Sequence, residues 1–180
     1  MATTITTGKV RLSYVKLFTP ATAPGSDTAK YSVSLLIDKS DKDTIKQINA
    51  AIEEAKAQGK NSKWGGKLPA NLKLPLRDGD TDKPDDEAYK GKYFLNASSV
   101  RKPGVVDRNV QPILDPEEVY SGCYGRANIN FYPFNANGNR GVAVGLNHVQ
   151  KVADGERLGG ATISVEAAFD DDFEDEDLLD

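Results

Sequence analysis

Apolar and polar residues alternate along several stretches of the chain, and this period of two predicts a mainly β protein. Apolar residues recur at every second position in Gly8–Phe18 and again in Lys30–Ile37. In the first stretch Val15 and Leu17 fall on the polar side, which indicates a bulge or a strand buried on both faces. The segment between the two stretches, 19–29, contains two prolines, so we expect a loop that joins an antiparallel pair.

More strands are predicted in the second half of the chain. Gly91–Val100 alternates as a third strand, and the strongest sheet signal comes from Val119–Phe134 and Arg140–Val152. The short segment between the last two is rich in Asn and Gly, which is the composition of a hairpin loop. We therefore expect a long β-hairpin, and Ala161–Val165 is a candidate for a last short strand.

One helix is predicted, at Ser40–Gly59. Isoleucines at 45, 48 and 52 form a narrow apolar stripe at helical spacing, which suits a helix packed on the edge or end of a sheet. Ser40 is the expected N-cap, with Asp43 in the capping-box position, and Gly59 is the expected end. Together the elements predict a single domain, residues 1–165, with an OB-fold-like Greek-key barrel, one α-helix and insertions.

The last fifteen residues, 166–180, differ in composition from this domain. Nine of them are acidic and none is basic, so we expect a disordered acidic tail. The whole chain has a formal net charge of −4, with 23 basic and 27 acidic residues. Without the tail the remaining chain carries 23 basic and 18 acidic residues, a formal charge of +5. The body can therefore bind an anion.

A tethered acidic tail is expected to occupy a cationic groove until a stronger polyanion displaces it. The alternative is a solubilising tail that makes no specific contact. The tail residues that we expect to meet partner proteins are Phe169, Asp170, Asp171, Asp172, Phe173, Glu174, Asp175, Glu176, Asp177, Leu178, Leu179 and Asp180.

One row of side chains on the first arm of the predicted hairpin suits nucleic-acid binding. Tyr124, Arg126, Asn128, Asn130 and Tyr132 share one face of this strand by the period of two. Such a row can stack on bases, contact phosphates and form hydrogen bonds with base edges. The alternative is a polar solvent face in which tyrosine serves only β propensity.

A second candidate is the only tryptophan, Trp64, which lies in a segment with lysines at 60, 63, 67 and 73. An aromatic ring between lysines on a loop can stack on a base while the lysines neutralise phosphates. The alternative is that Trp64 fills the core and its neighbours are solvated. The sequence alone favours neither.

Acidic residues at 78, 80, 82, 85 and 86 raise the question of a metal site. The first three fit a calcium loop, but Lys83 and Tyr89 stand where that loop requires Gly and Glu. We therefore expect an acidic surface loop without a metal. His148 has no ligand partners at metal spacing, and Cys123 lies on an apolar strand face. No catalytic or nucleotide-binding motif is present, so neither an enzyme nor a cofactor is expected.

Targeting signals are not recognised in the sequence. No apolar run approaches the length of a membrane helix, and the N-terminal residues lack a signal peptide's basic and apolar regions. The single cysteine cannot form an intrachain disulfide, which is consistent with a reducing compartment. We expect a cytoplasmic protein that does not contact a membrane.

The segment Phe94–Gly160 resembles bacteriophage single-stranded DNA-binding proteins long known only as a domain of unknown function. The blocks YSGCYGRANINFYPF and GVAVGLNHVQ carry most of the resemblance, and the WGGK and LRDGD segments extend it over nearly the whole chain. The resemblance implies an OB-fold core, sequence-independent binding of single strands and an acidic C-terminal tail, as in T7-type and bacterial binders. Those proteins end in an aromatic tip, whereas this chain ends in Leu178-Leu179-Asp180.

Residues and resemblance together lead to the hypothesis of a single-stranded DNA-binding protein of phage replication, recombination and repair, in the cytoplasm of the infected host. The tail would compete with DNA and recruit a phage DNA polymerase or helicase, and a homodimer is an open alternative to a monomer. The residues expected to contact nucleic acid are Lys9, Arg11, Trp64, Phe94, Arg101, Lys102, Tyr124, Arg126, Asn128, Asn130, Tyr132 and Arg140.

Two other classes remain open. The first is an interaction or chaperone-like protein whose acidic tail holds a basic partner. The second, less favoured, is a metal-dependent nuclease that uses the cluster Asp78–Asp86. That cluster lies on a Gly/Pro loop, whereas catalytic carboxylates require rigid support.

Overall fold

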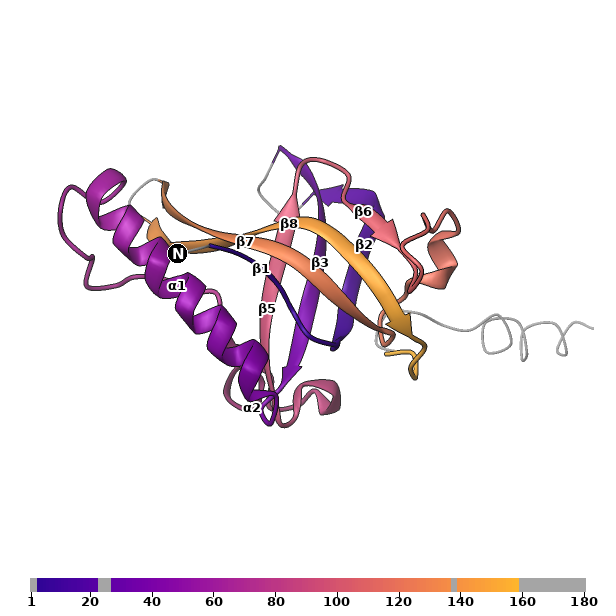
Figure 1. Cartoon of the computed structure of the whole chain (residues 1–180). Helices are drawn as coiled ribbons and strands as arrows, with labels where there is room; N and C mark the ends of the chain where they lie inside the picture. The colour runs from indigo at the N-terminus through magenta and orange to yellow at the C-terminus, as the bar shows by residue number, and fades with distance from the viewer. Residues whose placement is uncertain (1–2, 23–26, 137–138, 159–180) are drawn as a thin grey trace, which may run out of the picture.

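The computed structural model describes residues 3–22, 27–136 and 139–158 (Figure 1). Its elements are strands joined by one long helix and a few short helical turns. In chain order they are β1 Thr4–Thr6, β2 Val10–Thr22, β3 Ala29–Asp38, α1 Lys42–Ser62, β4 Arg77–Asp78, α2 Gly79–Asp82, η1 Glu87–Tyr89, β5 Lys92–Ser99, β6 Gly104–Val106, η2 Pro116–Glu118, β7 Tyr124–Ala136 and β8 Asn139–Ala153.

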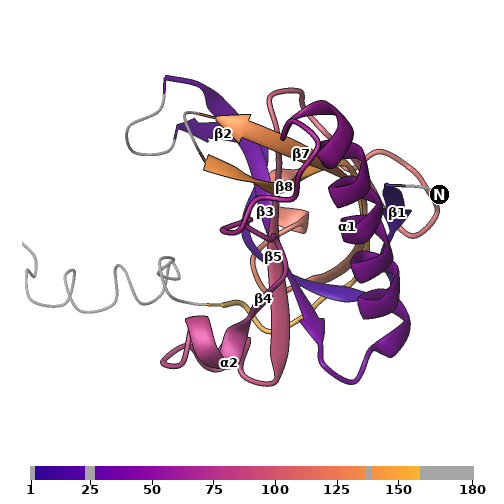
Figure 2. The same ribbon diagram turned by 90° about the vertical axis from the view of Figure 1, so that its left-hand side faces the viewer.

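Five of the strands pair into a ring. β2 pairs with β3, β3 with β5, β5 with β8, β8 with β7, and β7 with β2 again. All of these pairs are antiparallel except β5–β8, which is parallel. Figure 2 shows α1 along one side of the ring, with β3 and β5 on the other side. The prediction of a mainly β fold with one main helix and a long hairpin is confirmed.

The core fills the inside of the ring. Alternate residues of each strand point inward, as the period of two requires. The apolar stripe of α1 joins the same core through Ile48, Ile52 and two alanines. The strand side chains buried in this core include Val10, Leu12, Leu17, Val33, Leu35, Ile37, Leu95, Ala97, Ala127, Ile129, Phe131, Val142, Val144 and Leu146.

The helix differs from its prediction at both ends. Asp41, not Ser40, is the N-cap, and its carboxylate accepts a hydrogen bond from the Thr44 amide. The helix continues past Gly59 to Ser62, because Gly59 is buried against neighbouring side chains instead of adopting a left-handed end conformation. The turn away from the helix follows at Gly65 and its neighbour Gly66, which both have positive φ.

The bulge expected in β2 is confirmed. The register with β3 shifts between Ser13 and Lys16, and Tyr14 in between has a φ of 49°. The strand also runs on to Thr22, into the segment predicted as a loop, because Ala21 and Thr22 still pair with β3. The bulge reverses the direction of the side chains that follow, so Leu17 enters the core while Tyr14 points outward.

The segment between α1 and β5 holds small elements that the sequence did not predict. β4 pairs with β5, and α2 and η1 follow in the acidic loop. Tyr89 of η1 packs with Leu36 and Phe94 in a second, smaller apolar cluster on the outside of the ring. The third strand and the hairpin lie where they were predicted, whereas the candidate strand Ala161–Val165 and the tail lie outside the described residues.

Candidate nucleic-acid interface

The tyrosine–arginine–asparagine row lies on the outer face of β7, as predicted. Arg126 and Tyr132 are exposed, and the other three members of the row are half-buried. Tyr132 has 41% of its surface exposed, so its ring is open to a stacking partner. The row is therefore accessible from solvent, although several of its polar atoms already have partners.

Those partners belong to the neighbouring strands. Nε of Arg126 donates a hydrogen bond to the carbonyl oxygen of Thr7 at 2.8 Å. The amide of Asn128 donates to Thr6 Oγ1 at 2.9 Å, and its oxygen accepts from Asn147 at 2.9 Å. Much of the hydrogen-bonding capacity of the row therefore joins β7 to the N-terminal segment and to β8.

Tyr124 lies beneath two cations. The amine of Lys9 is 5.4 Å and the guanidinium carbon of Arg11 is 5.7 Å from the centre of its ring. Arg11 also donates to the carbonyl oxygens of Gly122, at 3.1 Å, and Glu156, at 2.6 Å. Arg11 therefore stabilises the chain around Gly122, and the ring of Tyr124 already has cationic partners.

The structure corrects the expectation that Trp64 stacks on bases. Its side chain is 6% exposed, packs against Gly59, and donates a hydrogen bond from Nε1 to the carbonyl oxygen of Phe134 at 3.0 Å. The alternative reading, in which Trp64 fills the core, is the one that the structure shows. The lysines beside it remain exposed.

Phe94 is corrected in the same way. It is 4% exposed and meets the ring of Tyr89 edge to face, with the ring centres 5.1 Å apart. Its role is to pack the outer apolar cluster, and a base has no free ring face to stack on. Of the remaining expected residues, Arg101, Lys102 and Arg140 are exposed, and the amine of Lys102 lies 5.2 Å from the centre of the Phe18 ring.

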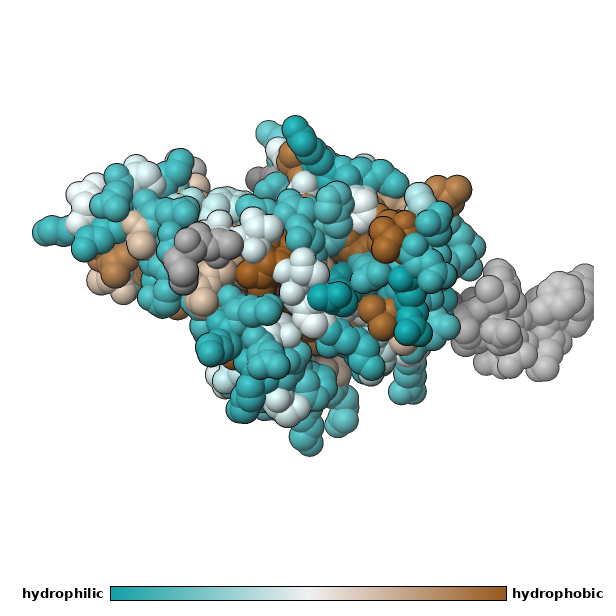
Figure 3. Space-filling model, in the orientation of Figure 1, coloured by the Kyte–Doolittle hydropathy of each residue, from teal (hydrophilic) through white to brown (hydrophobic). Residues whose placement is uncertain are grey.

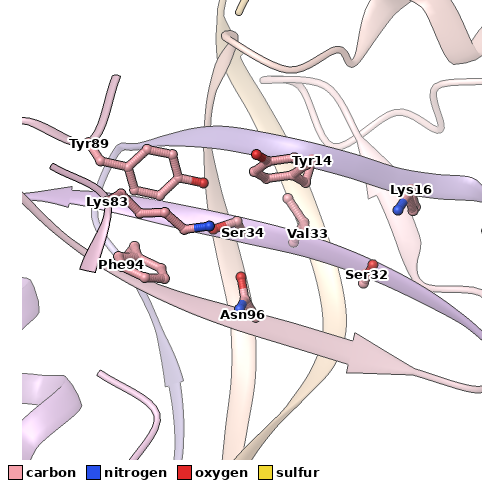
Figure 4. Close-up of a pocket in the computed structure, with 9 residues that line it drawn as sticks. All are labelled: Tyr14, Lys16, Ser32, Val33, Ser34, Lys83, Tyr89, Phe94 and Asn96. Carbon is pink, nitrogen blue, oxygen red and sulfur yellow. The ribbon is translucent and has the colours of Figure 1, made fainter. Parts of the chain in front are cut away.

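A surface that the sequence did not predict lies on the outer side of β2, β3 and β5, which we call the front face. It contains a hollow of about 230 Å³. Figure 4 shows side chains from the three strands and from the acidic loop pointing into it. The hollow is lined by Tyr14, Lys16, Ser32, Val33, Ser34, Lys83, Tyr89, Phe94 and Asn96.

The floor of the hollow holds a hydroxyl group without a partner. Ser34 is 2% exposed, and among the described residues its Oγ is the buried side-chain polar atom that has no hydrogen bond. Leaving such a group unpaired costs about 1–3 kcal/mol. The lining of the hollow therefore includes a polar group that a bound water or a ligand can satisfy.

Tyr14 stands at the rim of the same hollow. It is 56% exposed, and its positive φ is uncommon for a residue with a side chain. The bulge is held from below, because the amide of Val15 donates to Ser121 Oγ at 3.1 Å. The fold therefore holds Tyr14 in a strained conformation that presents its ring to solvent, and such strain is characteristic of functional positions.

The chemistry of the hollow suits an anionic, planar ligand. Lys16 and Lys83 supply positive charge, hydroxyl and amide groups supply hydrogen bonds, and no carboxylate lines it. The amine of Lys83 also lies 5.8 Å from the centre of the Tyr89 ring. A tyrosine beside lysines is a combination that stacks on bases and neutralises phosphates.

Three carboxylates of the acidic loop are engaged in ion pairs. Asp78 and Asp80 each lie 2.8 Å from the amine of Lys39, and both have a lowered pKa chiefly because of that partner. Asp82 pairs with Arg77 at 2.7 Å. Within the described ranges no group of three acidic, histidine or cysteine side chains is arranged to hold a metal ion.

The visible surface is polar over most of its area. Figure 3 shows hydrophilic residues broken by small, separate hydrophobic patches on this side of the molecule. Among the described residues, no helix is both long and apolar enough to cross a membrane. This side of the molecule therefore has no broad apolar surface of the kind that marks a protein interface.

Several solved structures are similar to this one. The single-stranded DNA-binding protein of bacteriophage Enc34, solved in complex with single-stranded DNA, has a TM-score of 0.76 and 29% identity, covering 87% of this chain and 90% of that chain. A second structure of the same protein has a TM-score of 0.73 and 27% identity, covering 93% of this chain and 90% of that chain. The gp2.5 single-stranded DNA-binding protein of bacteriophage T7 has a TM-score of 0.61 at 16% identity, covering 89% and 97%, which shows a shared fold.

The sequence comparisons agree. A protein named p50, from Acyrthosiphon pisum secondary endosymbiont phage 1, is 35% identical over 182 residues, covering 94% of this chain and 95% of that protein. The OB-fold-like class and the predicted family are thereby confirmed, and the family consists of binding proteins and not enzymes. Because the family described as "Enterobacter phage Enc34, ssDNA-binding protein" matches residues 3–179, this chain belongs to that family.

Proposed function

We propose that this protein binds single-stranded DNA without sequence preference, in the cytoplasm of the infected host, during phage DNA replication, recombination and repair. The observation that supports this most strongly is the hollow on the front face, which combines Tyr14, two lysines and the unpaired hydroxyl of Ser34. OB-folds bind oligonucleotides on the face of their second and third strands. In the ring these positions are held by β3 and β5, which form part of the front face. The solved complex of the Enc34 relative with single-stranded DNA is consistent with this proposal.

Each group of the hollow has a distinct task in the proposed complex. Tyr14 stacks on a base. This contact does not depend on the DNA sequence, because every base has a π face. Lys16 and Lys83 neutralise phosphates, and Ser34 donates its free hydroxyl to a phosphate or a base edge. These contacts include no fixed donor–acceptor pattern that would select one base over another.

The β7 row is proposed as a flanking contact. Tyr132 is open for stacking, and Arg126 is exposed although one of its nitrogens holds Thr7. Tyr124 and Arg11 are less available, because they pack on each other. Their share of the binding energy should therefore be smaller than that of the front face.

The acidic tail is proposed to compete with DNA and to recruit a phage DNA polymerase or helicase. The described chain ends at Leu158, which packs against the outer cluster of Leu36, Tyr89 and Phe94. The last two of these residues also line the hollow. The described part of the chain therefore ends beside the front face, and an acidic segment tethered to that end has a high effective concentration there.

One titration tests this function. Oligo(dT), duplex DNA and single-stranded RNA are each mixed with the full-length protein and with a chain that ends at residue 165, and binding is followed by gel shift. We expect oligo(dT) to bind best, with an affinity that falls steeply with salt and rises when the tail is removed. No oligonucleotide binding, together with capture of basic proteins by the tail, would favour an interaction protein, and magnesium-dependent cleavage would favour a nuclease.

A further inference from the structure

Five exposed cations gather where the loop after α1 meets the β7–β8 hairpin. Figure 1 shows the end of α1 at the same end of the molecule as the end of β7 and the start of β8, far from β6. None of the five lines the hollow of the front face. We call this group the hairpin basic cluster, and it consists of Lys60, Lys63, Lys67, Lys73 and Arg140.

The cluster is held to the β7 side of the hairpin by two anchors. The indole of Trp64 is buried and donates to the carbonyl oxygen of Phe134 at 3.0 Å. The side-chain amide of Asn135 donates to the carbonyl oxygen of Lys63 at 3.3 Å. The backbone at Lys63 is therefore fixed next to β7, although its side chain is exposed.

The β8 side is held by backbone hydrogen bonds. The amide of Lys73 donates to the carbonyl oxygen of Arg140 at 2.9 Å, and the amide of Val142 donates to the carbonyl oxygen of Lys73 at 2.9 Å. Arg140 pairs across the hairpin with Asn135. The order across the hairpin is thus Lys63, Asn135, Arg140 and Lys73, which places the backbone of three exposed cationic residues in one row.

No nearby acid in the sequence balances these charges. Residues 55–76 and 119–153 contain neither aspartate nor glutamate. Over the ranges that the structure describes, the ion pairs closer than 4 Å involve no member of the cluster. An uncompensated row of cations creates a positive potential that attracts a polyanion.

The cluster is connected to the front face by a short segment. Lys73 forms a bridge with Gly141 of β8, and four residues later Arg77 pairs with Phe94, which lines the hollow. Four residues of extended chain span about 13 Å. A DNA strand that leaves the hollow therefore reaches the cluster within a short distance.

We propose that the hairpin basic cluster binds the sugar–phosphate backbone of the same DNA strand beyond the front face. This inference rests on the proposed single-strand binding. The contact involves phosphates and not bases, because the aromatic ring at its centre, Trp64, is buried. Phosphate contacts of this kind carry no sequence information and are sensitive to salt.

The test compares two full-length triple variants that lose the same charge. K63Q/K73Q/R140Q removes the row, and K42Q/K46Q/R108Q removes three exposed cations elsewhere. Both are titrated with oligo(dT) of about 8 and about 20 nucleotides, within the range of lengths that OB-folds bind. We expect K63Q/K73Q/R140Q to lose about 100-fold in affinity for the longer oligonucleotide near 0.1 M salt, with a log–log salt slope smaller by about 2. Its affinity for the shorter one should stay near that of the unchanged protein.

The possible results separate this inference from the proposed function. If the unchanged protein binds neither oligonucleotide, the proposed function fails. If it binds both, but K63Q/K73Q/R140Q and K42Q/K46Q/R108Q have equal affinity for the longer oligonucleotide, the cluster does not bind the DNA strand. If K63Q/K73Q/R140Q loses the same affinity for both oligonucleotides, the cluster belongs to the primary site. If this variant gains affinity, the cluster binds the acidic tail. Either result overturns the inference. Matching circular dichroism spectra establish that the variants are folded.

Discussion

Gly59 of α1 is in direct contact with the ring of Trp64. A Cβ atom added to Gly59 would lie 2.7 Å from Cη2 of the indole and 2.6 Å from Cβ of Pro133. The helix, the loop after it and β7 therefore meet at a point where only glycine fits. This contact explains why Trp64 is part of the core and why the lysines around it are held close to the hairpin.

Replacing Gly59 with Ala tests this contact. At an open helix position the change would stabilise the protein by up to about 1 kcal/mol, because Ala has the higher helix propensity. Here we expect the free energy of unfolding to fall by about 1–3 kcal/mol, since the methyl group overpacks the site. Chemical denaturation measures it, with Q58A as an exposed control in the same helix. A stabilised G59A protein would contradict the close contact.

Ser34→Ala separates binding from stability. The buried hydroxyl has no partner in the free protein, so its removal should leave the free energy of unfolding unchanged or raise it by about 1 kcal/mol. Affinity for oligo(dT) should nevertheless fall by about 10-fold or more, the value of a hydrogen bond to a charged group. S98A, on β5 but outside the lining of the hollow, is the control for both measurements. Unchanged affinity for S34A would show that the hydroxyl does not meet DNA.

Cys123 should be unreactive in the folded protein. It is fully buried, and this burial raises the pKa of its thiol, so little of the reactive thiolate is present near neutral pH. We expect iodoacetamide to modify it only after unfolding, as measured by mass spectrometry. An S62C variant adds an exposed thiol at the end of α1 as the reactive control. Equal modification of both cysteines in the folded state would be inconsistent with the buried position.

Asp38 should titrate well below its usual range. The Ser40 amide donates to its carboxylate at 3.0 Å, the Ser40 hydroxyl does so at 2.8 Å, and Lys92 lies at 3.3 Å; together they lower its pKa from 3.8 to about 2. Because the pKa is lowered on folding, the stability from these contacts is complete above pH 3.8 and is lost as the pH falls toward 2. NMR titration of the side-chain carboxyl carbon measures this value. A midpoint near 3.8 in the native protein would rule out these contacts.

Much of the fold follows from the sequence, and the reason is visible in β3 and β5. Apolar residues occupy every second position of each strand and form its core face, so strand position and core face can be predicted together. The ends of α1 were less predictable, because Gly59 is explained by a tertiary contact with Trp64 and not by a helix end. Local patterns do not contain such contacts.

The front face could not be predicted in the same way. The pattern places Tyr14 with Val10 and Leu12 on the buried side, and only the bulge turns its ring outward. Ser34 and Asn96 are ordinary polar residues until pairing places them side by side on neighbouring strands. The sequence did contain a signal for this binding face. The outward positions at the centres of both strands hold serine or asparagine, and none of these central positions holds an acidic residue.

The central claim is that single-stranded DNA lies on the front face. It is tested most directly by fluorescence anisotropy titration of labelled oligo(dT) against two double variants, Y14A/K16Q on the front face and Y132A/R126Q on β7. Stacking contributes about 1–3 kcal/mol per base, so we predict that Y14A/K16Q loses about 10-fold or more in affinity and that Y132A/R126Q loses clearly less. Full affinity for Y14A/K16Q together with a large loss for Y132A/R126Q would contradict the claim and place the DNA on β7.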